Sequence, residues 1–187
     1  MLISQSKRQT NIIEYLLYMY QIEDIIRSFQ FNLTSIDTAI VQKYDQSDEV
    51  RKKMKFWYAD LIDKIKRQHI ERTGHLKELR ASIIQLQELH DQLLMVYFDK
   101  KYIDLYDDVK PALKELTVKA VGQDLINQVD VAVHGLYGLL MLRLKQKEVG
   151  TETQNAMDKI TAFLAHLAAK FKMMEAGKLE LPKVQGN

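Results

Sequence analysis

The sequence predicts an all-α fold, and three observations support that prediction. The 187 residues include 7 Gly and 2 Pro, the residues that most often interrupt helices, so interruptions are scarce. Apolar residues recur in steps of three and four along most of the chain, which is the period of one helix face. Polar start and stop signals separate these periodic segments. We therefore expect a single-domain bundle of six or seven helices over residues 1–177, with a flexible C-terminal tail at 178–187.

Capping signals indicate where the first three segments begin and end. These segments cover about residues 6–29, 34–44 and 48–73. Asn32 accepts a left-handed backbone and is expected to end the first segment. A capping-box variant opens the second, and Ser47 is expected to cap the third.

The remaining segments cover about residues 75–98, 111–121, 124–147 and 151–177. Residues 75–98 follow a break at a glycine and carry a coiled-coil-like seam of Leu76, Leu79, Ile83, Leu86, Leu93 and Tyr97. Residues 100–108 are expected to form a connector. Pro111 would then lie in the first turn of the next helix, where no backbone N–H is needed. A capping box at Thr151–Gln154 starts the last helix.

A central apolar helix is expected near residues 124–147. In its middle part only His134 and Arg143 are strongly polar, so the segment is apolar nearly all round. Helices of that kind lie inside a bundle, covered by the others. Gly135 and Gly138, on adjacent turns, are expected to let another helix approach closely.

The composition excludes several classes of protein. Lys and Arg number 27 against 25 Asp and Glu, so the net charge is +2 and no overall field attracts nucleic acid or anionic lipid. The chain has no Cys, which removes disulfides, thiolate catalysis and cysteine-based metal sites. Its longest apolar run, Gly135–Leu142, is far shorter than the roughly 20 residues that span a membrane. No secretion signal is recognisable at the start. We expect a cytoplasmic protein that contacts no membrane.

Known metal and catalytic motifs are missing. No His is preceded three residues earlier by Glu, as in di-iron helical bundles, and neither His-x-x-x-His nor His-Glu-x-x-His occurs. There is also no phosphate-binding loop, dinucleotide glycine motif or Gly-x-Ser-x-Gly elbow. We therefore expect no metal, no cofactor and no catalytic residues, although Asp130 and His134 could still bind a metal ion with help from another helix. The sequence favours a non-enzymatic role, although an active site of another kind stays open.

Six polar side chains interrupt apolar helix faces. Glu23 lies in the middle of the apolar face of the first segment, and Arg27, one turn later, is its nearest expected partner. His90 takes a place in the apolar seam where Leu is expected, and Asp130 and His134 lie one turn apart on the central helix. The candidate cluster comprises Glu23, Arg27, His90, Asp130, His134 and Tyr137. Such groups occur at functional sites, but satisfied structural networks bury polar residues in the same way.

Basic and aromatic residues lie together at the start of the third segment, in the runs Arg51–Lys55 and Phe56–Tyr58. Nucleic-acid-binding surfaces combine these residue types. The apolar members nevertheless share one helical stripe that is typical of a core, while the basic residues alternate with acidic ones on the opposite face. We therefore expect a solvated helix face rather than a nucleic-acid site.

Three runs carry a resemblance to a known family. They are Glu14–Arg27, Leu136–Leu144 and Thr151–Gln154. In this order they resemble an uncharacterised bacterial family catalogued as domain of unknown function 4924, and the resemblance covers almost the whole chain. It implies an all-helical cytoplasmic protein of unknown role and supplies no catalytic residues.

Two functions therefore stay open, with nucleic-acid binding third. The first is an interaction or scaffold protein that forms a homo-oligomer, in the simplest case a dimer, through the apolar faces of residues 48–73 and 75–98. The same seam could instead be wholly internal. The second is a binding protein or small enzyme whose polar cluster lines a pocket for a small polar or anionic ligand. In that case Arg27 would hold charge and His90 would exchange a proton.

Overall fold

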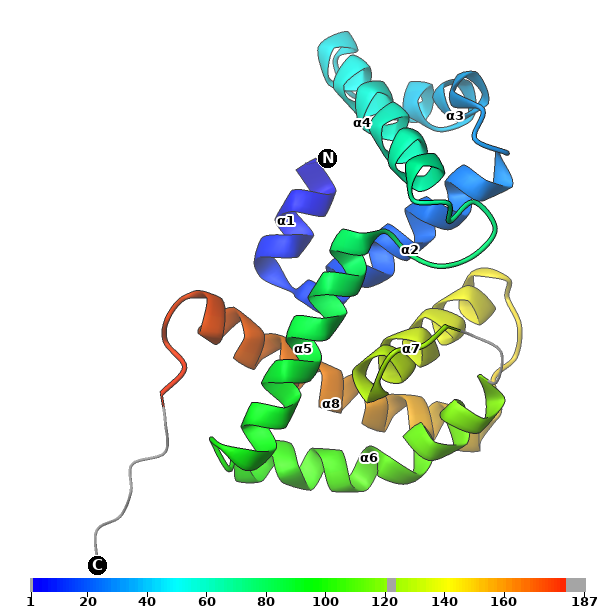
Figure 1. The fold of residues 1–187 in the computed structure, drawn as a ribbon. Helices are drawn as coiled ribbons and strands as arrows, with labels where there is room; N and C mark the ends of the chain where they lie inside the picture. Colours follow the sequence, from blue (N-terminus) through cyan, green and yellow to red (C-terminus); the bar gives the residue numbers. More distant parts are fainter. Residues whose placement is uncertain (1, 121–123, 181–187) are drawn as a thin grey trace, which may run out of the picture.

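The structure, a computed structural model, describes residues 2–120 and 124–180, and every regular element in those ranges is helical (Figure 1). The elements in chain order are α1 (Leu2–Thr10), α2 (Ile12–Ser28), α3 (Leu33–Ala39), the 3-10 helix η1 (Val41–Lys43), α4 (Asp48–Arg67), α5 (Lys77–Met95), α6 (Lys100–Lys119), α7 (Gln128–Leu144) and α8 (Thr151–Glu175). The all-α prediction is confirmed. The predicted count of six or seven was too low, since these ranges contain eight α-helices.

The first predicted helix is in fact two helices that meet at Asn11. Asn11 has an extended backbone, with φ −155° and ψ 109°, and its side-chain oxygen accepts hydrogen bonds from the N–H groups of Ile13 and Glu14. An extended residue cannot continue a helix, and an asparagine there satisfies the free amides of the next one. No apolar residue lies between Ile3 and Ile12, so helical periodicity carries no signal there and did not reveal the break.

Helix α6 replaces the connector that the sequence predicted at residues 100–108. The Asp99 side chain accepts a hydrogen bond from the N–H of Tyr102 at 3.0 Å and so caps the helix. Pro111 lies inside the helix rather than in its first turn. Val109 and Leu113, on either side of it, are buried. Their burial favours continuing the helix past a residue that lacks a backbone N–H.

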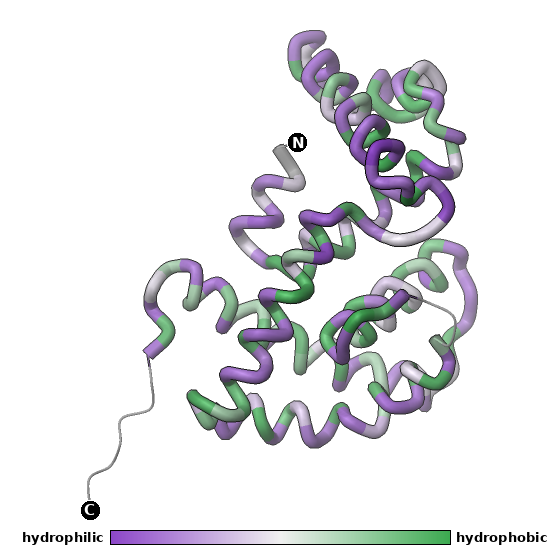
Figure 2. The backbone as a smooth tube through the Cα atoms, in the orientation of Figure 1, coloured by the Kyte–Doolittle hydropathy of each residue, from purple (hydrophilic) through white to green (hydrophobic). Residues whose placement is uncertain are grey.

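Helix α7 is central only in part. It packs against α2, α5, α6 and α8, as expected for the apolar helix. In Figure 2, α7 is coloured mostly hydrophobic, whereas α4, at the top of the view, is mostly hydrophilic. Residues Val129–Val133 are buried, but Leu142 and Leu144 are 40% and 59% exposed. Close approach is confirmed at Gly135, where an added Cβ would lie 2.7 Å from Cδ1 of Leu116 on α6. It is wrong at Gly138, where an added Cβ would meet no atom of another helix within 4 Å among the described residues.

The apolar seam of α5 lies inside the molecule. Leu79, Ile83, Leu86 and Leu93 are all buried, and α5 packs against α6, α7 and α8 of the same chain. Helices α3 and α4 pack together at the end of the molecule away from α6 and α8, and α2 connects them to the other helices (Figure 1). In the described parts of the chain, no helix combines the length and hydropathy needed to cross a membrane. Most of the predicted tail lies past residue 180, outside the described residues.

Candidate functional site

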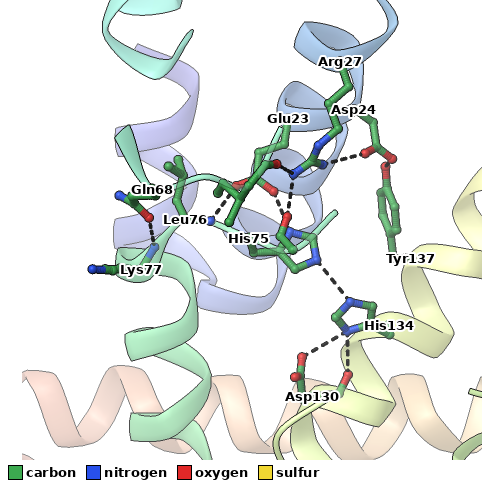
Figure 3. A network of polar contacts seen from close by, with 12 residues as sticks. Glu23, Asp24, Arg27, Gln68, His75, Leu76, Lys77, Asp130, His134 and Tyr137 are labelled. Carbon is green, nitrogen blue, oxygen red and sulfur yellow. Dashed lines mark hydrogen bonds and ion pairs between the residues drawn. The ribbon is translucent and has the colours of Figure 1, made fainter. Parts of the chain in front are cut away.

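Ionisable side chains from α2, α7 and the loop between α4 and α5 meet around one pocket (Figure 3). Five of the six residues singled out by the sequence lie in or beside it, together with one that the sequence did not single out, His75. The five are Glu23, Arg27, Asp130, His134 and Tyr137. His90 lies elsewhere.

Glu23 is fully buried on the apolar face of α2, as its position in the sequence predicted. Its Oε1 accepts a hydrogen bond from the N–H of Leu76 at 2.9 Å. Its Oε2 lies 2.5 Å from Nδ1 of His75. A buried carboxylate is strongly destabilising without such partners. The prediction that Arg27 would pair with Glu23 is wrong, because both Glu23 oxygens face the loop that precedes α5.

Arg27 holds that loop instead. One of its terminal nitrogens donates to Asp24 at 3.0 Å, and the other donates to the carbonyls of Ile70 and Gly74 at 3.2 and 2.5 Å. Gly74 has φ +92°, a backbone conformation that favours glycine and turns its carbonyl toward the guanidinium. Nε of Arg27 is buried and has no hydrogen-bond partner in the described ranges. Arg27 therefore fixes the loop that carries His75.

The two histidines face each other. Nε2 of His75 lies 3.1 Å from Nε2 of His134. On its other side, Nδ1 of His134 lies 3.0 Å from Oδ1 of Asp130. The second oxygen of Asp130 accepts a hydrogen bond from the N–H of Ile126. The result is an unbroken row of carboxylate, imidazole, imidazole and carboxylate, with both carboxylates buried.

Two tyrosines complete the wall around the histidines. The ring of Tyr20 stacks on His75, with centroids 3.6 Å apart. The hydroxyl of Tyr137 donates to Asp24 at 2.6 Å. Burial raises the pKa of both phenols above the ordinary range for tyrosine. Both side chains are therefore neutral hydroxyls at physiological pH.

The pocket has a volume of about 370 Å³ and a polar lining. Arg80 and Arg72 line it together with Arg27. Arg80 pairs with Asp124 at 2.5 Å. Arg72 is exposed and has no ion-pair partner within the described ranges. An unpaired cation therefore lies at the same pocket as the two histidines.

His90 forms a separate polar contact and does not join the cluster. It is buried on the α5 seam, and its Nδ1 lies 2.7 Å from the hydroxyl of Tyr102 on α6. Burial lowers the pKa of His90 below its ordinary value. The predicted grouping is wrong because His90 lies about 20 Å along α5 from Lys77, at roughly 1.5 Å per residue, and only the N-terminal end of α5 is next to the pocket.

Few signs in the sequence indicated His75 as a site residue. It precedes the first turn of α5 and belongs to an irregular loop, so helical periodicity assigns it no face. Its position directly after Gly74, where the helix was expected to break, is the one local sign of a special conformation. The other sign was a buried carboxylate, Glu23, without an assured partner.

In the two described ranges, no three His, Cys, Asp or Glu side chains are arranged to hold a metal ion. The sequence model of the family described as a domain of unknown function, DUF4924, matches residues 1–178. The chain belongs to the DUF4924 family. No curated protein and no solved structure matches it. Apart from Arg72, each side chain named in this site has a hydrogen-bond, ion-pair or ring partner among the described residues.

Proposed function

We propose that this DUF4924 protein binds a small anionic ligand in the pocket between α2, α5 and α7. The observation that carries the proposal is the convergence of Arg72 and two histidines on one small polar cavity. A volume of 370 Å³ lies in the range of about 300–1,000 Å³ that is usual for small-molecule sites. The proposed role is binding, and no reaction is assigned to it.

The charges around the pocket favour an anion. Arg27 and Arg80 already have the carboxylate partners Asp24 and Asp124. Arg72 is the cation at this pocket that has none among the described residues. A carboxylate or phosphate group could pair with Arg72 in a planar, two-bonded arrangement. The imidazoles and the Tyr137 hydroxyl would then contact polar atoms further inside.

The test is a titration of the full chain with inorganic phosphate, followed by amide chemical shifts in NMR. We expect saturable shifts around Gly74, His75 and His134. The substitution Arg72→Gln should weaken binding about 10-fold or more, because a hydrogen bond to a charged group contributes about 1.5–3 kcal/mol. Arg72 is exposed, so folding should not change.

Arg67→Gln is the matched control. Arg67 is also an exposed arginine but pairs with Asp63 on the outer face of α4. Phosphate affinity should therefore be the same in this variant and the wild type. Shifts scattered over the surface, or equal binding by the Arg72 variant, would contradict the proposal.

A second function, self-association, is favoured by one exposed apolar corner. Met95, Val96 and Phe98, where the chain passes from α5 to α6, are 70%, 50% and 65% exposed. Contiguous exposed apolar side chains are typical of interaction surfaces. The α5 seam itself is covered within the chain, so this corner replaces it as the proposed contact of a homodimer.

Light scattering tests that contact. The wild type should have the mass of a dimer, and the double variant Met95→Lys, Phe98→Ser that of a monomer. Phe56→Ser is the control, since Phe56 is 75% exposed but lies on α4. A wild-type monomer at high concentration would rule out the dimer.

Nucleic-acid binding stays third. On the outer face of α4, Lys53, Lys64 and Arg67 pair with Glu49, Asp60 and Asp63 of the same helix. Cations that are already paired contribute less to phosphate binding. We place the protein in the cytoplasm, which is compatible with a chain without cysteine.

A further inference from the structure

The row of two carboxylates and two imidazoles leaves a charge unaccounted for between the histidines. A carboxylate only accepts hydrogen bonds, so each histidine presents its Nδ1–H to its own carboxylate, Glu23 or Asp130. Each Nε2 then directs a lone pair at the other across 3.1 Å. Two facing lone pairs repel unless a positive charge lies between or beside them.

A proton or a metal ion could supply that charge, and the two differ in what they neutralise. One shared proton balances one of the two carboxylates and leaves the other uncompensated within the row. A divalent ion balances both. Glu23 is fully buried and Asp130 nearly so, at 0% and 6% exposure, and neither has an arginine or lysine partner within the described ranges. Within the row itself, a divalent ion therefore leaves less buried charge unpaired than a shared proton does.

The distance between the two nitrogens is close to that at a shared metal ion. Two nitrogen ligands at about 2.0–2.1 Å from one tetrahedral zinc ion lie roughly 3.3–3.4 Å apart. The observed separation of the Nε2 atoms is 3.1 Å, so a small outward shift of the two rings would admit the ion. Metal-binding histidines also characteristically present their other nitrogen to a carboxylate or a carbonyl, which fixes the ring. Both rings here are held in that way, and His75 is further fixed by stacking on Tyr20.

From this geometry we infer a site for a divalent transition-metal ion of the zinc class, bound by Nε2 of His75 and Nε2 of His134. Imidazole nitrogen is a preferred ligand of Zn²⁺, Ni²⁺ and Cu²⁺ rather than of Mg²⁺ or Ca²⁺. The described residues supply no third His, Cys, Asp or Glu ligand, so water or a pocket ligand takes the remaining positions. The site is therefore open toward the pocket.

Motif searches could not find this pair. The two histidines lie 59 residues apart, one in a loop and one in a helix, so no spacing rule connects them. The sequence predicted no metal site because the known ligand spacings are missing and periodicity does not show which residue of another element would join Asp130 and His134. The inference goes beyond the proposed anion pocket and does not depend on it.

The test uses the full chain without a polyhistidine tag, stripped of metal by a chelator and kept in a buffer without phosphate or carboxylate. Co²⁺, a spectroscopic substitute for Zn²⁺, is added and visible absorption is followed. Calorimetry with Zn²⁺ gives the affinity. We expect one ion per chain. His75→Gln and His134→Gln should each weaken binding by more than about 10-fold, and Glu23→Gln by about 10- to 100-fold, the usual cost of losing a partner of a ligating histidine.

His69→Gln is the control, because His69 is an exposed histidine in the same loop, six residues from His75. Its affinity for the metal should equal that of the wild type. X-ray absorption at the zinc edge of the wild type needs no variant and should show two imidazole nitrogens at about 2.0–2.1 Å. The inference is overturned by a lack of saturable Co²⁺ binding, by equal weakening in the His69 variant, or by a zinc spectrum without imidazole ligands. Since no anion is present, failure here is distinguishable from failure of phosphate binding.

Discussion

Replacing Glu23 by alanine should destabilise the protein by about 2–6 kcal/mol, because two interior donors each lose an acceptor at a cost of about 1–3 kcal/mol. The substitution leaves the N–H of Leu76 and Nδ1 of His75 without their acceptor, and it opens space on the buried face of α2. Urea denaturation would measure the change as a shift of the midpoint at constant slope.

Glu23→Gln is the matched comparison. The amide oxygen can still accept from Leu76, and the amide N–H can donate to Nδ1 if His75 carries its hydrogen on Nε2. We expect a smaller loss of about 1–2 kcal/mol. Wild-type stability in both variants would show that the buried contacts of Glu23 contribute nothing to folding.

Acidification should destabilise the protein through His90, by at most about 2 kcal/mol at pH 5, the limit for a histidine that stays neutral when folded. Burial lowers the pKa of His90, with Asp91 raising it and Lys110 lowering it to smaller extents. The unfolded chain therefore binds a proton at higher pH than the folded one. The stability is fully present above about pH 6.5, the ordinary pKa of histidine, and is lost as the pH falls below it.

The variant His90→Leu should remove this part of the pH dependence. At pH 7 it should cost about 1–3 kcal/mol, because the fully buried hydroxyl of Tyr102 loses its partner. The double variant His90→Leu, Tyr102→Phe should recover most of that cost while keeping the weaker pH dependence. His69→Gln, at an exposed histidine, should change neither quantity. An unchanged difference between pH 5 and pH 7 in the His90 variant would contradict the assignment.

Periodicity predicted the buried faces of the helices well and their boundaries less well. Glu23 and His90 are both buried, as expected for polar residues on apolar stripes. The breaks depended on local hydrogen bonds instead. Asn11 and Asn32 act as N-caps through their side chains. The prediction that Asn32 ends the first helix in a left-handed conformation is wrong, because Asn32 has φ −83° and caps α3 instead. The persistence of α6 through Pro111 depended on burial of its neighbours, which one sequence does not display.

Most members of the candidate site could be predicted from the sequence, but their contacts could not. Asp130, His134 and Tyr137 share the pocket because they lie on consecutive turns of one helix. Which other helix they face is decided by tertiary packing. His90 was assigned to them on the expectation that the three helices meet at these residues, and α5 reaches the pocket only near its start. His75 lies in a loop, where no period applies.

The spacing of the site along the chain has a consequence for how the molecule assembles. Glu23 and His75 are 52 residues apart, and His75 and His134 a further 59. Contacts between such distant residues close long loops and bring no benefit until those loops are closed. A folding intermediate in which α7 has not docked would therefore have half of the histidine pair and no binding site. Whatever binds there selects the completed fold from all earlier ones, and by mass action it increases the population of that state.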